Sequence, residues 1–400
     1  MQVMSWTRML QVVGVGVVLL AMAGCHGNQR QEWVDQADNR WLTLRSGVML
    51  DLASQQFEAG DLAMAEKTLG EAMQMDPANP RLHVLAGRIL LEQGRLERSY
   101  HLFNVALDLN EELPEAYYYQ GLVLQRWQEY QRAHDNYRRA YELEADNVSY
   151  LLAQMEMLVQ IGQLPEAESV LRSRLNYFDQ SAAMRAALGH VLVMQGRANE
   201  AVPFIRQASL LDPEDLQARE QLAMALLSAG EHAQAARELA HLLDEPEMAD
   251  RHDLRRLLAR AHVRLERFDR ARAAYLELAR GPAAEAGDWI KLAELAWRAE
   301  DHGAAFHAAT RAIDMAPSRH EGYLIAGMSL HQRGRLDEAL SMFDRAAERA
   351  PGQAMPLIMR GLALQQAERY AAAAEAYEAA LALQPENERA RRLLESVSAQ

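Results

Sequence analysis

Residues 114–147 read PEAYYYQGLVLQRWQEYQRAHDNYRRAYELEADN, and this stretch carries the pattern that decides the fold. Its small residues are spaced at fixed intervals, because Gly121 is followed by Ala133 after twelve residues and by Ala140 after seven more. Strong helix formers fill both halves of the stretch. We predict two helices that cross at the small residues, since short side chains allow two backbones to approach closely.

The same spacing recurs with a period of 34 residues along the chain. One series comprises Ala65, Ser99, Ala133, Ala167, Ala201 and Ala235, and it continues after a two-residue insertion as Ala271, Ala305, Ala339 and Ala373. Twelve residues before each member lies a second series: Ala53, Gly87, Gly121, Met155, Gly189, Ala223, Ala259, Ala293, Gly327 and Gly361. Glycines such as Gly60 mark the turn between the two helices, and prolines such as Pro77 close a repeat. The sequence therefore predicts about ten stacked helix-turn-helix repeats.

We place the boundaries of these ten repeats at residues 46–79, 80–113, 114–147, 148–181, 182–215, 216–251, 252–285, 286–319, 320–353 and 354–387. Residues 388–400 are expected to form a C-terminal capping helix, because an open stack needs a polar end over its last apolar face. Residues 25–45 are expected to hold a linker and an N-terminal capping helix, with Trp33 and Trp41 on its inner side.

Composition agrees with an all-α chain. Of the 400 residues 50% are hydrophobic but only 6% are aromatic, and the abundant types are strong helix formers. The formal net charge is −14, which disfavours binding to the phosphate backbone of nucleic acids.

The repeat pattern resembles that of the tetratricopeptide repeat, and the resemblance covers residues 46–387. It implies a right-handed superhelical solenoid that binds other proteins in a concave groove lined by the first helix of each repeat. The groove positions that the family supplies fall in the third, fifth and eighth repeats. They are Tyr118, Leu122, Gln125, Arg126, His190, Val193, Met194, Ile290, Glu294, Trp297 and Arg298.

A strip of three arginines marks the seventh repeat. Arg256, Arg260 and Arg264 are four residues apart, so they project from one helix face into the predicted groove. One interpretation is a receptor for an acidic segment or a chain terminus, because guanidinium groups bind carboxylates in bidentate fashion. The other is a solvated ion-pair strip, neutralised by Glu220 and Glu294 from the flanking repeats. The sequence leaves both open.

The first 25 residues carry a targeting signal. Arg8 precedes the apolar run Met9–Met22, which is shorter than the ~20 residues that span a bilayer, so we predict a cleaved signal peptide over residues 1–24. Residues 20–25 (LAMAGC) resemble a bacterial lipobox, which implies lipidation of Cys25, the single cysteine. His26 after it points to the outer membrane, facing the periplasm. An ordinary signal peptide with a free thiol is the alternative.

The sequence contains no catalytic motif such as His-Glu-x-x-His or a Walker loop. We therefore expect no enzymatic activity, cofactor, metal site or small-molecule substrate. The predicted function is a membrane-anchored scaffold or adaptor of the bacterial cell envelope, whose partners are proteins or peptide segments. Two alternatives stay open: an assembly factor that multimerises, similar to the pilotins of type IV pilus or secretin assembly, and an enzyme.

Overall fold

The computed structural model describes residues 33–34 and 36–398, and every regular element in these ranges is an α-helix. This confirms the predicted all-α class for the part of the chain that the structure describes. None of these helices is both long and apolar enough to cross a membrane. The predicted signal peptide, residues 1–24, and Cys25 lie outside the described residues. The chain divides into two compact units, Met1–Val191 and Leu192–Gln400.

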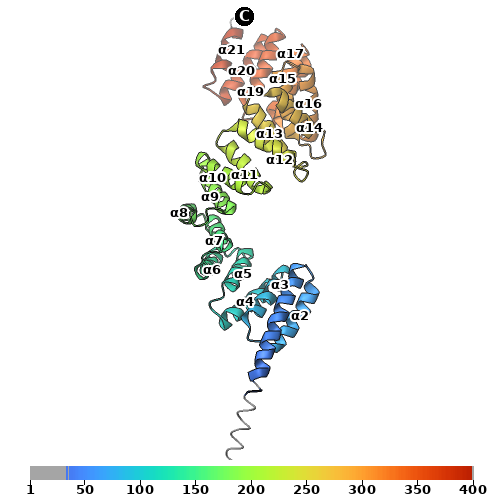
Figure 1. The fold of residues 1–400 in the computed structure, drawn as a ribbon. Helices are drawn as coiled ribbons and strands as arrows, with labels where there is room; N and C mark the ends of the chain where they lie inside the picture. The colour runs from blue at the N-terminus through green and yellow to red at the C-terminus, as the bar shows by residue number, and fades with distance from the viewer. Residues whose placement is uncertain (1–32, 35, 399–400) are drawn as a thin grey trace, which may run out of the picture. The chain divides into compact units, whose positions relative to one another are not determined.

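The first unit is a stack of helical hairpins (Figure 1). It contains a first helix over residues 36–58, followed by α2 (Leu62–Met75), α3 (Pro80–Glu92), α4 (Leu96–Leu109), α5 (Pro114–Arg126), α6 (Tyr130–Leu143), α7 (Val148–Gln160) and α8 (Leu164–Arg174). Helix α9 (Ala182–Met194) crosses the boundary between the units. One apolar cluster joins Ala53 of the first helix, Leu69 of α2 and Leu82 of α3, which shows how one hairpin packs on the next.

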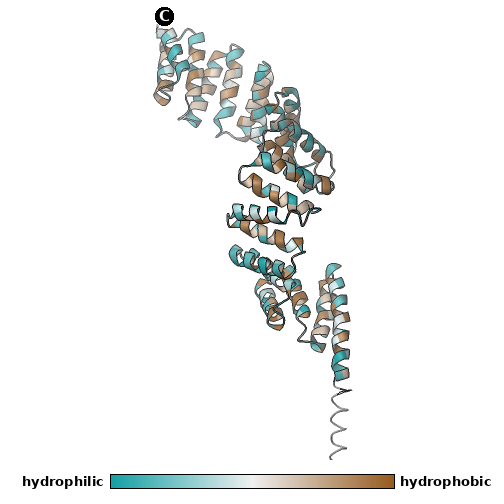
Figure 2. Ribbon diagram, turned by 60° about the vertical axis from the view of Figure 1, so that its left-hand side comes forward, coloured by the Kyte–Doolittle hydropathy of each residue, from teal (hydrophilic) through white to brown (hydrophobic). Residues whose placement is uncertain are grey.

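The second unit continues the same hairpin pattern. Its helices are α10 (Ala198–Leu211), α11 (Leu216–Ser228), α12 (His232–Leu243), α13 (His252–Arg264), α14 (Phe268–Arg280), α15 (Ala286–Arg298), α16 (His302–Met315), α17 (His320–Gln332), α18 (Leu336–Arg349), α19 (Ala354–Gln366), α20 (Tyr370–Leu383) and α21 (Glu388–Ser398). The last helix, α21, packs on α20 and buries Ala390 and Val397. Apolar and hydrophilic residues alternate along the helices, as helices with one buried face require (Figure 2).

The alanine series lies where the two helices of a hairpin cross. All its members have no exposed surface: Ala65, Ser99, Ala133, Ala167, Ala201, Ala235, Ala271, Ala305, Ala339 and Ala373. Ser99 fits because its hydroxyl donates a 2.7 Å hydrogen bond to the Gly87 carbonyl oxygen, so the buried polar group is paired.

Four glycines of the second series make room for aromatic rings. The pairs are Gly87 with Phe103, Gly121 with Tyr137, Gly327 with Phe343 and Gly361 with Tyr377, and a Cβ at each glycine would come within 3.0 Å of its ring. Gly189 is buried in the same register. Where alanine takes the glycine position, as at Ala53 and Ala223, the residue sixteen positions later is the smaller Leu69 or Leu239. The volumes of the two positions therefore compensate each other in these repeats.

The turn inside every repeat uses the left-handed backbone conformation. Six glycines adopt positive φ there: Gly60, Gly94, Gly162, Gly196, Gly230 and Gly334. The four remaining repeats place Gln128, Glu266, Glu300 and Glu368 at the same position, with φ between 55° and 62°. Each of these residues costs about 1 kcal/mol relative to glycine there, so the turn is imposed by the packing of the helices on either side.

The N-terminal segment differs from the prediction in one respect. The expected capping helix and the first helix of the first repeat form one continuous helix from residue 36 to residue 58. Trp33 and Trp41 were predicted on an inner face, but they are 71% and 56% exposed. The reason is that the buried face of this helix lies about 120° or more around it from Trp41, at residues such as Ala53 and Phe57.

The glycine-to-ring contact predicts opposite effects for two glycine-to-alanine changes. Gly361→Ala should lower the free energy of unfolding by about 1 to 2 kcal/mol, because overpacking against Tyr377 exceeds the gain in helix propensity. Gly70→Ala, within α2, should raise it by up to about 1 kcal/mol, because a Cβ there meets nothing within 4 Å. Urea unfolding followed by circular dichroism measures both. Shifts of the same sign would contradict the packing described here.

Candidate functional site

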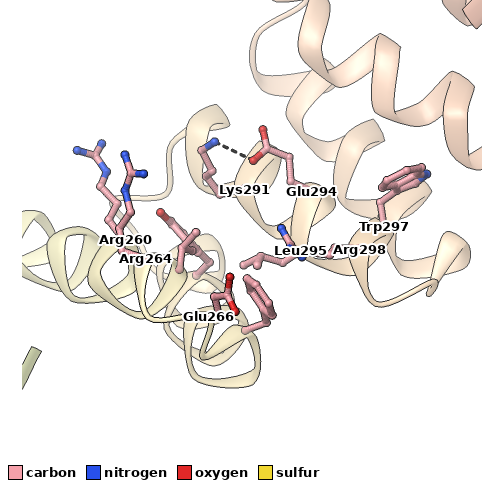
Figure 3. A pocket seen from close by; sticks show the side chains of 11 residues that line it. Arg260, Arg264, Glu266, Lys291, Glu294, Leu295, Trp297 and Arg298 are labelled. Atoms are coloured by element: carbon pink, nitrogen blue, oxygen red, sulfur yellow. Dashed lines mark hydrogen bonds and ion pairs between the residues drawn. The ribbon is translucent and has the colours of Figure 1, made fainter. Parts of the chain in front are cut away.

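A pocket of about 780 Å³ opens in the second unit, between α13 and α15 (Figure 3). Its apolar lining consists of Val263, Phe268, Leu295 and Trp297, together with the Tyr275 ring. Its charged lining consists of Arg260, Arg264, Lys291, Arg298, Glu266 and Glu294. Four cations therefore face two carboxylates, so the pocket has an excess of positive charge.

Arg260 and Arg264 project side by side from α13 (Figure 3). Both side chains are exposed, and Arg264 takes part in no ion pair among the described residues. Burial raises the pKa of Tyr275 in the adjoining α14, and the charge of Arg260 beside it partly offsets that rise. The two guanidinium groups thus lie side by side on the exposed face of α13.

The α15 side of the pocket is more fully paired. Lys291 Nζ lies 2.7 Å from Glu294 Oε2, and this ion pair is drawn in Figure 3. The guanidinium carbon of Arg298 lies 4.3 Å from the centroid of the Phe268 ring, a cation–π contact. Of the two carboxylates in the lining, one is therefore already neutralised.

Arg256 does not line this pocket, which corrects the prediction that all three arginines of the strip share one surface. Its Nε and one terminal nitrogen donate to the two carboxylate oxygens of Asp288, each at 2.9 Å. It also pairs with Glu285 at 2.8 Å and donates to the Ala283 carbonyl oxygen at 2.7 Å. The hydrogen bond with Asp288 raises the pKa of Arg256. Arg256 therefore ties α13 to the start of α15.

The neutralising acids that the sequence suggested have other partners. Glu220 accepts a 2.8 Å hydrogen bond from Arg251, and Glu294 pairs with Lys291. The ion-pair interpretation of the arginine strip is therefore wrong in its named partners. Ile290, predicted to line the groove, is only 3% exposed and belongs to the core, whereas Trp297 and Arg298 do reach the pocket.

The groove residues predicted in the third repeat line a smaller depression of about 420 Å³. Leu122, Gln125 and Arg126 meet there. Gln125 accepts a 2.8 Å hydrogen bond from Tyr137 and donates one of 3.1 Å to Glu156, while Arg126 donates to the Leu91 carbonyl oxygen at 3.2 Å. Gln125 and Arg126 therefore already have hydrogen-bond partners within the chain, in contrast to the unpaired Arg264 of the larger pocket.

Tyr118 lies apart from that depression, in a cluster of aromatic rings. Its centroid is 5.3, 5.5 and 5.0 Å from those of Tyr119, Tyr137 and Tyr150. Burial raises the pKa of Tyr118, which therefore stays a neutral packing residue. His190 and Met194 are both exposed on α9, on either side of the boundary between the units. In the described part of the chain no three His, Cys, Asp or Glu side chains are grouped to hold a metal ion.

Family models described as "Tetratricopeptide repeat" match residues 56–120, 186–247, 220–286, 290–354 and 354–387. Together they cover more than half of the chain and follow the hairpins described above. The chain belongs to the tetratricopeptide repeat family. Proteins of this family mediate protein–protein interactions.

This tetratricopeptide repeat protein is similar to several solved structures, of which the first described here shows the same fold. The C-terminal part of a repeat-containing protein from Cytophaga hutchinsonii is 16% identical, with 61% of this chain and 99% of that chain covered and a TM-score of 0.52. A tetratricopeptide repeat protein from Parabacteroides merdae is 19% identical, with coverages of 63% and 98% and a TM-score of 0.45. The Cut9-Hcn1 hetero-tetramer of APC/C is 12% identical, with coverages of 88% and 96% and a TM-score of 0.40.

Sequence reasoning missed the partner of Arg256 and part of the pocket lining. Asp288 lies 32 residues after Arg256, and Arg251 bonds Glu220 across 31 residues, so each pair links one repeat to the next. The sequence signal that could have predicted these contacts is a pair of opposite charges separated by 31 or 32 residues, slightly less than one repeat. Phe268 and Lys291 carried no such signal, because single apolar and cationic residues are common on helices.

The role of Arg256 predicts a large difference between two neighbouring substitutions. Asp288→Ala should lower the free energy of unfolding by about 3 kcal/mol, since it removes the carboxylate that binds the largely buried Arg256 guanidinium through two hydrogen bonds and also accepts from the Glu285 backbone N–H. Arg264→Ala should change it by less than about 0.5 kcal/mol, because that side chain is exposed and unpaired. Chemical denaturation measures both. Equal effects would show that Arg256 does not hold the two repeats together.

Proposed function

We propose that this tetratricopeptide repeat protein is a membrane-anchored scaffold of the bacterial cell envelope, and that it binds acidic segments of partner proteins in the pocket between α13 and α15. The observation that carries the proposal is the charge of that pocket. Arg260 and Arg264 stand side by side and exposed, while Glu294 is held by Lys291. A carboxylate of a partner replaces the missing counter-charge.

The chemistry of the lining favours a peptide over a simple anion. Two adjacent guanidinium groups bind carboxylates in bidentate geometry. Phe268 and Trp297 supply apolar surface within the same pocket, where an aromatic or aliphatic side chain next to the acidic group packs. The partner segment that fits therefore combines a carboxylate, either a side chain or a chain terminus, with an apolar neighbour.

The membrane attachment rests on the sequence of residues 20–25, which resembles a lipobox ending at Cys25. Acyl chains on Cys25 would hold the protein on a membrane, since each buried methylene contributes about 0.8 kcal/mol. With His26 following the cysteine, the proposed location is the outer membrane, with the repeats facing the periplasm.

The pocket is tested by reversing its charge. The double variant Arg260→Glu with Arg264→Glu should reduce binding of a fluorescent peptide of glutamates ending in a free carboxylate by at least about tenfold, equivalent to ~1.4 kcal/mol. Binding to the unaltered protein should also weaken as salt is added, because exposed charges are screened.

The matched control is Arg98→Glu, an exposed arginine on α4 in the other unit. It makes the net charge more negative without touching the pocket, and it should leave peptide binding almost unchanged. Thermal unfolding of all variants shows whether the fold is intact. Equal binding by the double variant and the control would remove the pocket as the binding site.

The anchor is tested separately by fatty-acid labelling in cells. The unaltered protein should incorporate an alkyne-tagged fatty acid, and its mature mass should correspond to a chain that begins at an acylated Cys25. Cys25→Ser should incorporate none, because serine offers no thiol for the thioether link. Absence of label from the unaltered chain would overturn the lipid attachment and leave the pocket untouched.

A further inference from the structure

A second hollow of about 510 Å³ adjoins the pocket between α13 and α15, beside the turn that joins α13 to α14. The two hollows share four lining residues, which are Glu266, Phe268, Leu295 and Arg298. The second hollow adds Arg267, Asp269, Arg270 and Ala299. The surface open to a partner therefore continues from α13 to the start of α14, beyond the first-helix positions that line the groove predicted from the family.

Phe268 and Arg298 lie where the two hollows meet. Phe268 is the first residue of α14 and Arg298 is the last residue of α15. The guanidinium carbon of Arg298 is 4.3 Å from the centroid of the Phe268 ring, so the two side chains form one cation–π pair. Figure 3 shows Arg298 well apart from Arg260 and Arg264. A chain that occupies both hollows therefore has to cross the Phe268–Arg298 pair.

The second hollow has cations of its own. Arg267 and Arg270 are both exposed, and neither guanidinium group forms an ion pair or a hydrogen bond among the described residues. Across the two hollows six cationic side chains face three carboxylates. One of these carboxylates, that of Glu294, is already held by Lys291. The excess of positive charge thus extends over both hollows, although the whole chain carries a formal net charge of −14.

The buried imidazole of His262 shows which sign of charge prevails beside the second hollow. His262 is 8% exposed, and its backbone carbonyl oxygen accepts a 2.9 Å hydrogen bond from the Arg267 backbone N–H. Burial lowers the pKa of His262, and the charges of Arg270 and Arg267 lower it further. The carboxylates of Glu266 and Asp269 do not offset these two charges at the imidazole. The potential on this side of the hollow is therefore positive.

We propose that the second hollow is a subsite for a second acidic side chain, so that the protein selects partner segments in which an apolar residue lies between two carboxylates. This inference rests on the proposed function of the first pocket. Arg260 and Arg264 bind one carboxylate, the apolar side chain packs on Phe268, and Arg267 and Arg270 bind the other carboxylate. A chain terminus with a single carboxylate fills the first pocket alone.

One peptide in both hollows gains affinity, because the second contact becomes intramolecular once the first has formed. The lining also separates a peptide from a uniformly charged polyanion. Phe268 and Leu295 lie between the two groups of cations, and a polymer that is charged at every unit has no apolar group to place there. A peptide that alternates acidic and apolar side chains matches this order of groups.

A series of fluorescent peptides with amidated ends tests the subsite. Each peptide carries two glutamates separated by a spacer of about one to four residues that includes a leucine, and its partner peptide has one glutamate changed to glutamine. At the best spacing the peptide with two glutamates should bind the full chain at least about tenfold more tightly than its partner. Fluorescence anisotropy measures both dissociation constants.

Substitutions assign that advantage to particular arginines. Arg267→Gln combined with Arg270→Gln should remove it, while the binding of peptides with one glutamate stays almost unchanged. Arg260→Gln combined with Arg264→Gln should weaken both kinds of peptide. Arg280→Gln is the matched control, because Arg280 is exposed at the other end of α14 and lines neither hollow, and it should alter neither dissociation constant. Thermal unfolding shows whether each variant is folded.

Two outcomes would overturn the subsite and leave the first pocket standing. One is equal binding of the two kinds of peptide at every spacing, and the other is an advantage that survives the change of Arg267 and Arg270. Displacement of the peptide by single-stranded DNA at equal concentration would assign these arginines to nucleic acid instead. If the change of Arg260 and Arg264 affected no peptide, the proposed function itself would fail, and the subsite with it.

Discussion

The close crossing of two helices within each hairpin is the constraint on which the rest of this structure depends. Side chains no larger than a methyl or hydroxymethyl group, such as Ala133 and Ser99, have no exposed surface at the crossing. Because the backbones meet there, the turn between them is short and forces the left-handed conformation even on Gln128 and Glu300. The same closeness fixes which faces remain for the neighbouring hairpins. The strain in the turns, the stacking of the hairpins and the placement of their exposed faces therefore all follow from the limit on side-chain volume at the crossing.

Repetition made much of the architecture predictable from sequence. A period of 34 residues placed the two series of small residues and six of the turns, because these features depend only on local volume and backbone conformation. The four turns without glycine were not predicted, since a glutamate such as Glu266 or Glu368 does not by itself indicate positive φ. Continuity of the first helix was missed for a similar reason. A polar segment before a repeat can extend its helix as readily as it can form a separate one.

The binding surface was less predictable, because the partners of charged side chains depend on which repeat each faces. The regular spacing of Arg256, Arg260 and Arg264 correctly placed them along one helix. It could not show that Arg256 reaches the buried carboxylate of Asp288 on the next repeat, while Arg264 does not. Ile290 was predicted to line the groove because its position does so in the family, but in this chain it faces the core. Rules for the family describe an average groove, whereas ion pairs depend on individual neighbours.

The two ends of the described chain are chemically unlike. At the C-terminal end α21 buries Ala390 and Val397 and leaves Arg389, Arg391, Arg392 and Glu395 facing water. At the opposite end the first helix leaves Trp41, Leu44, Val48 and Leu52 exposed. Of the two ends, the N-terminal one therefore costs more free energy to hydrate, because contact between water and apolar side chains is unfavourable.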